Sequence, residues 1–267
     1  MRSWALRLIR SVADIPPVRS LYEAVLQNQI SSGPMPSHVG LILDGNRRWA
    51  REHNVSSVEG HKEGAKKLEQ VLSWFRQLKI VTVTLYALST ENLARPPDEV
   101  KGILSVVEQY LTKAIEDGVF QRERVRVRFL GERGLLPSEI TGLMEDLEES
   151  TMQNSESFLN IAIGYGGRTE IVNAARRMVT LAANGLLTPA EVTEDLVGSF
   201  LYTAHLPNPD PDLIIRTSGE VRVSNFLLWQ SAYSELFFLD IYWPDFRKID
   251  LLRAIRSYQR RDRRLGK

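Results

Sequence analysis

The sequence contains no cysteine among its 267 residues. Without a thiol the protein can have no disulfide framework, no cysteine nucleophile and no cysteine-ligated zinc or iron–sulfur site. Cysteine usage therefore excludes three kinds of site and leaves the cellular compartment open.

Long apolar runs and an excess of one charge are also missing. No stretch approaches the roughly 18 apolar residues that cross a membrane, and Arg7 and Arg10 interrupt the N-terminal apolar run before it reaches the length of a signal peptide. With 34 basic and 33 acidic side chains, the chain is neither a globally basic nucleic-acid binder nor an acidic scaffold. Hydrophobic residues make up 43%, enough to offset chain entropy by burial in a globular core.

From residue 37 onward, strand-like and helix-like segments alternate. Apolar runs at 39–43, 80–88, 125–130, 158–163, 213–215 and 226–228 predict strands, and segments with 3.6-residue periodicity predict helices. Strands separated by long helices imply right-handed crossovers and a mainly parallel sheet. We therefore predict an α/β fold with helices flanking a mainly parallel sheet. It forms one catalytic domain over residues 36–267, after an N-terminal helical arm over 1–35.

Ligands of such sheets bind at the carboxyl ends of the strands, and Asp44, Gly45 and Asn46 directly follow the first predicted strand. An Asp at this point is well placed to hold Mg²⁺ beside a phosphate. The glycine lets the backbone approach closely, and the next helix offers free N–H groups. The alternative is an Asp that only caps the helix.

Residues 216–224 follow the fifth predicted strand and carry two arginines and several hydroxyls around a glycine. Guanidinium groups bind phosphate in a bidentate fork, so Arg216, Arg222 and Ser224 predict a diphosphate clamp. Glu235 is a second carboxylate in an apolar stretch, where burial is costly unless the charge is paired or bound to metal. With the apolar helix that starts at Pro97, these features predict a pocket for an amphiphile with a diphosphate head.

Two further turns carry polar residues. Residues 89–95 combine hydroxyls, an amide and an arginine, and residues 164–168 form a glycine-rich turn that ends in Arg168. The glycine turn matches neither the dinucleotide fingerprint nor the P-loop.

Together these segments resemble the cis-prenyltransferases, the Z-type polyprenyl diphosphate synthases that include undecaprenyl and dehydrodolichyl diphosphate synthases. The resemblance covers residues 36–266 and rests on six ordered motifs, at 38–46, 60–61, 89–92, 164–168, 215–220 and 225–230. Such enzymes add isopentenyl diphosphate, with Z geometry, to an allylic diphosphate primer. The resemblance implies an alkyl transferase of isoprenoid biosynthesis with Mg²⁺ as cofactor, an apolar tunnel and a homodimeric assembly.

The resemblance also implies roles for single residues. Asp44 would bind Mg²⁺, with Glu235 as a further ligand. The other residues expected to act in catalysis would assist diphosphate departure or proton transfer: Asn46, Arg48, His61, Ser89 and Asn92. Those expected to hold substrate are Gly45, Arg47, Trp49, Arg95, Arg216, Arg222, Ser224 and Arg264. Arg264 belongs to a closing Arg-x-Gly that would reach the active site across the dimer interface.

Four positions depart from the family pattern: Arg47 stands where bacterial members often have Gly, Ser57 replaces an Arg, Leu93 an aromatic residue and Val221 a His. Arg51 could supply the phosphate contact that Ser57 lacks. None of these departures removes the metal carboxylates or the main arginine clamp, so we expect an active enzyme.

Two other functions are compatible with parts of the sequence. A non-catalytic partner subunit of a heteromeric prenyltransferase would typically lack the first Asp and the clamp, both of which this chain keeps. A phosphatase-like enzyme with Asp44 as nucleophile would need a second Asp where Asn46 stands.

The ends of the chain and two small residues suggest finer properties. Residues 1–30 predict short helices that either pack on the domain or lie on a membrane surface. Residues 247–267 carry nine basic and two acidic side chains, which suits a solvated helix or attraction of anionic lipid or substrate. We expect a cytoplasmic protein, with peripheral membrane contact for product release as a further option, and no nucleic-acid partner. Small Ala87 and Ser157 favour a medium or long product over a fifteen-carbon one.

Overall fold

The computed structural model describes residues 16–260, in two compact units. The larger unit spans Ser37–Asp245, and the smaller one joins the segments before and after it. Residues 1–15 and 261–267, which include the start of the expected arm and Arg264, lie outside the described residues.

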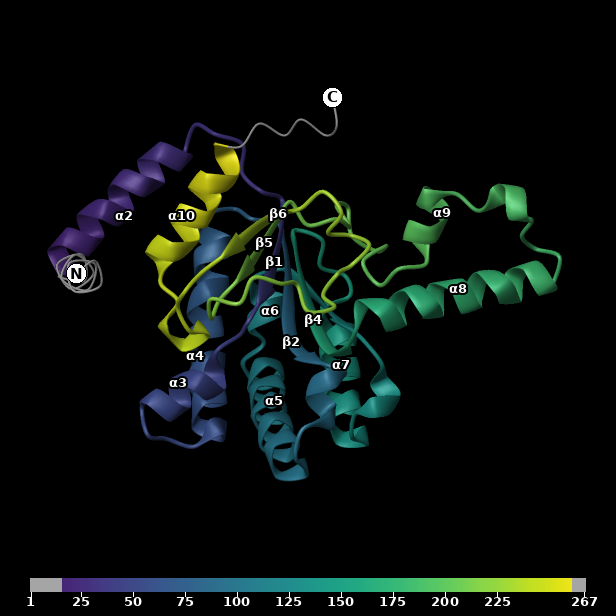
Figure 1. Cartoon of the computed structure of the whole chain (residues 1–267), viewed down its shortest axis with the longest axis horizontal. Helices are drawn as coiled ribbons and strands as arrows, with labels where there is room; N and C mark the ends of the chain where they lie inside the picture. The colour runs from purple at the N-terminus through teal and green to yellow at the C-terminus, as the bar shows by residue number, and fades with distance from the viewer. Residues whose placement is uncertain (1–15, 261–267) are drawn as a thin grey trace. The chain divides into compact units, whose positions relative to one another are not determined.

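The larger unit is built on a sheet whose six strands, in the described residues, all run parallel in the order β3-β4-β2-β1-β5-β6 (Figure 1). The strands are β1 (His38–Ile42), β2 (Thr82–Ser89), β3 (Val125–Leu130), β4 (Ser157–Tyr165), β5 (Leu213–Arg216) and β6 (Glu235–Phe238). The helices between them are α3 (Asn46–Glu52), α4 (Ser57–Gln77), α5 (Pro97–Asp117), α6 (Val119–Arg122), α7 (Ser138–Thr151), α8 (Gly167–Ala183) and α9 (Glu194–Ser199). The prediction of a helix-flanked parallel sheet is thus confirmed.

One predicted strand is wrong. Residues 226–228 form bends and a turn, and Leu227 has a φ of 43°. Ser224 and Asn225, just before them, also have positive φ, of 48° and 65°. Positive φ is incompatible with an extended strand. The run is apolar because Phe226 and Leu227 are fully buried in a core cluster with Ile42, and the last strand is β6 instead.

The long helix α5 shows how local sequence and packing agree. Pro97 stands at its first turn, where a missing N–H has no cost, and Gly118 ends it with a φ of 56°. Its apolar face, which includes Ile103 and Leu111, packs with residues of α7 and of strands β2, β3 and β4. This face and its neighbours form the second core cluster of the unit.

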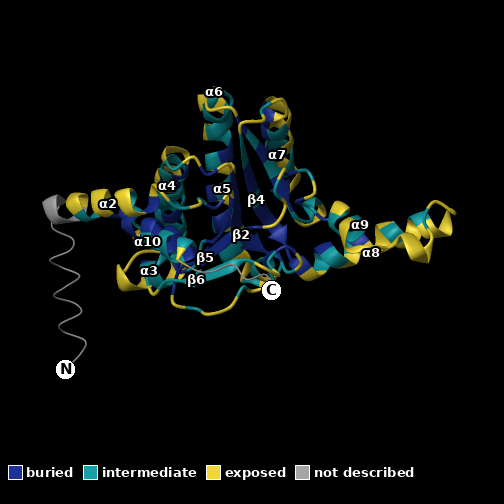
Figure 2. Cartoon of the chain, turned by 90° about the horizontal axis from the view of Figure 1, so that it is seen from above, coloured by how far each residue is buried: buried dark blue, intermediate teal, exposed yellow. Residues whose placement is uncertain are grey.

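Helices α8 and α9 extend away from the sheet as a largely exposed hairpin (Figure 2). Between them lies the short helix η3 (Pro189–Glu191), and the other short helices of the unit are η1 (Glu91–Ala94), η2 (Arg133–Leu135) and η4 (Trp243–Asp245).

The smaller unit pairs α2 (Pro16–Ile30) with α10 (Lys248–Gln259). The Arg253 guanidinium lies 5.3 Å from the Tyr22 ring, and the Gln259 amide donates to the carbonyl of Ile30 at 3.0 Å. Within residues 16–260, helices are too short or too polar to cross a membrane.

Candidate active site

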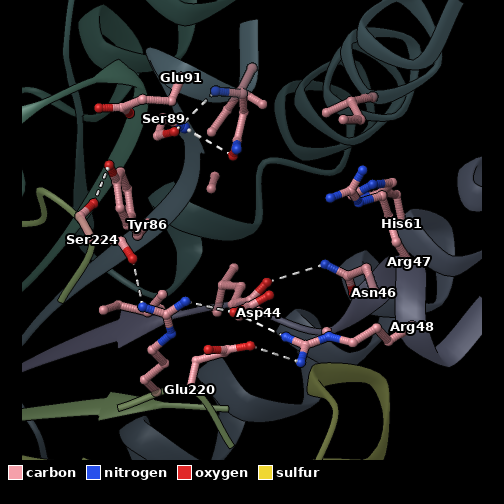
Figure 3. A pocket seen from close by; sticks show the side chains of 18 of the residues that line it. Asp44, Asn46, Arg47, Arg48, His61, Tyr86, Ser89, Glu91, Glu220 and Ser224 are labelled. Atoms are coloured by element: carbon pink, nitrogen blue, oxygen red, sulfur yellow. Dashed lines mark hydrogen bonds and ion pairs between the residues drawn. The ribbon is translucent and has the colours of Figure 1, made fainter. Parts of the chain in front are cut away.

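A cavity of about 740 Å³ opens at the carboxyl ends of β1, β2 and β5 (Figure 3). Asp44, Arg48 and Glu220 lie on one side of it, and Tyr86, Ser89 and Glu91 on another. This is the place that a parallel sheet offers for a ligand.

Most of the site residues predicted from sequence line this one cavity: Asp44, Gly45, Asn46, Arg47, Arg48, His61, Ser89, Asn92, Arg95, Arg216, Arg222 and Ser224. They come from segments up to 180 positions apart, and the parallel register explains why they meet. Ile42, at the end of β1, pairs with Tyr86 of β2 on one side and with Arg216 of β5 on the other. Their individual roles stay predictions.

Of the predicted site residues within 16–260, two do not line the cavity. Trp49 donates from Nε1 to Asp245 at 2.9 Å and stacks on His53 with ring centroids 4.0 Å apart. Glu235 begins β6 and pairs with Leu213 of β5. Leu213 precedes Arg216 by three residues, so Glu235 lies roughly 10 Å from the level of Arg216 along the strands. The structure therefore does not bring the two predicted metal carboxylates together within one chain.

The centre of the site is an ion pair between Asp44 and Arg216. The Arg216 guanidinium donates from Nη2 to Asp44 Oδ2 at 2.8 Å, and from Nη1 to Ser224 Oγ at 2.7 Å and to the carbonyl of Arg222 at 2.5 Å. Only 5% of the Arg216 side chain is exposed, against 30% for Asp44. One buried guanidinium thus fixes the carboxylate and the turn that carries Ser224.

The electrostatics keep Asp44 ionised. Burial by itself raises the pKa of Asp44, but hydrogen bonds from Arg216 and Ser218 and the charges of Arg216 and Arg48 outweigh it, so the pKa lies below its usual value. Ser218 Oγ donates to Oδ2 at 2.7 Å, and Arg48 Nη2 lies 3.4 Å from the same oxygen.

This donor set could hold Mg²⁺ together with phosphate oxygens of a ligand. Within the described part of the chain, the hydrogen bonds and ion pairs of the Asp44 carboxylate all go to Oδ2, which leaves Oδ1 available to a cation. Residues 16–260 contain no cluster of three or more metal-ligating side chains. Mg²⁺ commonly binds through one or two carboxylates together with substrate phosphates, so a single aspartate suffices.

Gly45 sets the direction of α3, which carries Asn46, Arg47 and Arg48 into the cavity. Its φ of 111° is one that L-residues rarely adopt, and a Cβ there would lie 2.9 Å from the Tyr242 ring. Asn46 donates from its side chain to the carbonyl of Leu43 at 3.2 Å, while its buried Oδ1 has no hydrogen-bond partner in the described residues.

The opposite wall is formed by the end of β2 and by η1. The Ser89 and Asn92 side chains each accept from the other's backbone N–H, at 3.1 and 3.4 Å, which locks the turn. A bulge lets neighbouring residues line the same cavity: Tyr86 pairs with Ala162 and Leu88 with Ile163, so Ala87 has no partner of its own in β4.

His61 lies at the third side of the cavity, beside an arginine pair. Burial, and then the charges of Arg95 and Arg47, lower the pKa of His61 to about 4. Glu99 holds both arginines, at 3.1 Å from Arg95 and 3.3 Å from Arg47. His61 is therefore uncharged near neutral pH, and its buried Nε2 has no partner among residues 16–260.

Several lining residues are not predicted by the sequence pattern: Tyr86, Glu91, Glu220 and Asn225, with Arg51 expected only as a substitute contact. Tyr86 was hidden in an apolar strand, although a hydroxyl at a strand's carboxyl end was a usable signal. Its hydroxyl donates to the carbonyl of Ser224 at 3.1 Å, and its ring stacks on Phe226.

The glycine-rich turn serves packing. Asn225 accepts from the backbone of Gly167 at 2.7 Å and of Arg168 at 2.9 Å, so it satisfies the first N–H groups of α8. A Cβ on Gly166 would lie 2.8 Å from Asn225 Nδ2. These glycines allow α8, the 225 turn and Thr90 to approach closely.

Comparison with known proteins agrees with the geometry. A family model described as putative undecaprenyl diphosphate synthase matches residues 42–266. The chain is 48% identical to a tritrans,polycis-undecaprenyl-diphosphate synthase (geranylgeranyl-diphosphate specific) of Methanopyrus kandleri, over 95% of this chain and 93% of that protein. It is 49% identical to an isoprenyl transferase of Thermus thermophilus, over 97% and 99%.

Solved structures show the same fold. Lavandulyl diphosphate synthase from Lavandula x intermedia, in complex with dimethylallyl diphosphate, superposes with a TM-score of 0.84 at 34% identity, over 87% of this chain and 99% of that one. A probable undecaprenyl diphosphate synthase from Campylobacter jejuni gives 0.71 at 30% identity, over 88% and 100%. The chain belongs to the undecaprenyl diphosphate synthase family of cis-prenyltransferases, which confirms the resemblance inferred from its motifs.

Proposed function

We propose that this protein is a Mg²⁺-dependent cis-prenyltransferase that condenses isopentenyl diphosphate onto an allylic diphosphate primer, with a medium or long polyprenyl diphosphate as product. The observation that carries the proposal is the buried Arg216, whose guanidinium joins Asp44 to Ser224 in a cavity that is also lined by Arg222 and four further arginines. Such a cluster suits two diphosphate groups better than any neutral ligand.

The cations of the site would act on the leaving group. Arg216, Arg222 and Ser224 would hold isopentenyl diphosphate, and Asp44, Asn46 and Arg48 would orient the primer. As the primer's C1–O bond breaks, negative charge grows on its diphosphate, and donors already fixed near it lower the barrier. Mg²⁺, which Asp44 would hold, supplies further charge neutralisation when bound.

The second half of the reaction is a proton loss. The new bond joins C1 of the primer to C4 of isopentenyl diphosphate, and a proton then leaves C2 of the isopentenyl unit. Two groups on the cavity walls are candidates to accept this proton. One is His61, which is uncharged and has an Nε2 without a partner among the described residues. The other is the pair Ser89 and Asn92, whose side chains each bind the other's backbone. Leu88 and Ile103 extend the cavity toward the apolar core cluster, which supports an apolar tunnel that keeps water from the allylic centre.

Primer choice and assembly are finer proposals. The Methanopyrus relative is named geranylgeranyl-diphosphate specific, which favours a long primer here.

The segment 221–233 exposes Val221 by 75% and Tyr233 by 76%, together with Trp229, which supports a homodimer through this segment. The exposed Leu21 and Val25 of α2 support a peripheral membrane contact.

A non-catalytic partner subunit is the less favoured alternative, because the chain keeps Asp44 and the arginine clamp in one cavity. The deciding test offers labelled isopentenyl diphosphate and Mg²⁺ with geranyl, farnesyl or geranylgeranyl diphosphate in separate reactions. We expect extension by several units, best with the longest primer. No product with any primer, repeated in detergent, would favour the partner subunit.

A further inference from the structure

Glu220 lies between two arginines of the cavity. Its Oε1 is 3.3 Å from Arg48 Nη1 (Figure 3). Its Oε2 accepts a hydrogen bond from Arg222 Nη1. Arg48 in turn lies beside Asp44, and Asp44 beside Arg216. The wall of the cavity is thus a line of alternating charges: Arg222, Glu220, Arg48, Asp44 and Arg216.

The two carboxylates of this line differ in how firmly they are held. Asp44 pairs with an Arg216 side chain that is 5% exposed, whereas Glu220 pairs with side chains exposed by 36% and 60%. Solvent weakens ion pairs of the second kind to a small net contribution. Glu220 can therefore be displaced at little cost, while Arg216 and Asp44 stay together.

The backbone beside Glu220 is anchored, so displacement needs only its side chain to rotate. Ser218 and Gly219 donate from their N–H groups to the carbonyls of Ile241 and Leu239, at 2.6 and 2.8 Å. Glu220 itself is followed by the exposed Val221 and Arg222.

We propose that Glu220 is a displaceable internal counter-ion of the diphosphate site, an inference that rests on the proposed function. A diphosphate that binds at either Arg48 or Arg222 must take over the contact of that arginine with the Glu220 carboxylate. Glu220 is thus a positioning residue: it holds the two guanidinium groups toward the cavity and competes with the ligand for them. The competition lowers the affinity for substrate and for released pyrophosphate alike.

The test is calorimetric titration of inorganic pyrophosphate into the metal-free protein in EDTA, with the parent chain and Glu220→Gln. Because the lost pairs are partly exposed, we expect Glu220→Gln to tighten binding by about three- to tenfold. A merely structural role of Glu220 would weaken binding. Glu220→Asp keeps the charge but is too short to contact both arginines, so we expect a smaller tightening; it also serves if Glu220→Gln does not fold.

Two matched variants separate pairing from total charge. Glu91→Gln removes a carboxylate from the opposite wall, where the described side-chain contacts of Glu91 are with Asn225, Thr90 and Ser89 and with no guanidinium. Glu145→Gln removes one whose partner Arg133 lies outside the cavity lining. Less than a twofold change is expected for both.

The titrations distinguish the role of Glu220 from the presence of a diphosphate site. If the parent binds pyrophosphate and Glu220→Gln binds it equally or more weakly, the inference about Glu220 is overturned and the diphosphate site stands. The inference is also overturned if Glu91→Gln tightens binding as much as Glu220→Gln does. If neither the parent nor Glu220→Gln binds pyrophosphate, the diphosphate site itself is wrong, and both fall.

Discussion

Arg216 and Asp44 are 172 positions apart in sequence, yet Nη2 of the one donates to Oδ2 of the other at 2.8 Å. The contact follows from the sheet, because the adjacent parallel strands β1 and β5 end side by side. It joins the proposed metal ligand to the proposed diphosphate clamp, so neither side chain can move without the other.

Asp44→Asn keeps the shape of the side chain and removes its charge. We expect kcat/KM to fall by about 10²- to 10³-fold, or about 3–4 kcal/mol, because the developing diphosphate charge loses its cation. Circular dichroism should match the parent. Steady-state rates with labelled isopentenyl diphosphate make the measurement, and near-parental rates would rule out the metal role.

Arg216→Lys tests the buried guanidinium that contacts both Asp44 and Ser224. Lysine cannot reach Asp44 and Ser224 together, so we expect weaker pyrophosphate binding and a loss of about 1–3 kcal/mol in the free energy of unfolding. Arg222→Lys, at an exposed position, should change that free energy by less than about 0.5 kcal/mol. Urea unfolding of both variants decides it: equal stabilities contradict the claim that Arg216 organises the site.

Gly45→Ala tests the turn before α3. The positive φ and the close Tyr242 ring should together cost about 1–3 kcal/mol and disturb Arg48. The matched control is Gly142→Ala in α7, where a Cβ meets open space. There we expect a gain of about 0.5–1 kcal/mol from helix propensity. A neutral Gly45→Ala would show that α3 does not depend on this backbone geometry.

His61 makes stability depend on pH. Its pKa is lowered from 6.5 to about 4 in the folded protein, first by burial and then by Arg95 and Arg47. The unfolded chain therefore takes up a proton earlier as pH falls. The contribution is fully present above about pH 6.5 and is lost toward pH 4, by up to about 1.4 kcal/mol per pH unit. Urea unfolding at pH 7.5 and 5.0 should show a shallower loss in His61→Gln than in the parent; identical slopes would mean that folding does not lower the pKa of His61.

Ala87 is expected to limit product length. It lines the cavity at the β2 bulge between Tyr86 and Leu88. A larger side chain there would exclude part of the growing chain, and each five-carbon unit left unburied forfeits about 4 kcal/mol. Ala87→Leu should shift the sized, dephosphorylated products to shorter chains. Ala94→Leu, on the exposed side of η1, is the control and should leave the product lengths unchanged. If Ala87→Leu also leaves them unchanged, Ala87 does not limit the length of the product.

Sequence reasoning found the elements that depend on local pattern. Strand alternation and the polar residues after each strand were enough to predict a parallel sheet and to gather Asp44, Ser89 and Arg216 at one edge. Parallel strands have a fixed direction, so their carboxyl ends meet whatever their order.

Features that depend on contacts between distant parts of the chain could not be predicted from the sequence. The position of Glu235 depends on the register of β6 against β5, which leaves no trace in residue periodicity. The turn at 226–228 was mistaken for a strand because burial makes both apolar, and only the positive φ of Leu227 separates them. Glu220 was overlooked because its importance lies in two arginines, one of which is 172 positions away.

The geometry of the newly formed double bonds decides whether the protein is a cis-prenyltransferase. Purified protein, Mg²⁺ and ¹³C-labelled isopentenyl diphosphate are incubated with geranylgeranyl diphosphate, and the dephosphorylated product is examined by NMR. We expect Z double bonds in every added unit and E double bonds only in the units that come from the primer. Added units in E geometry, or no incorporation, would contradict this expectation.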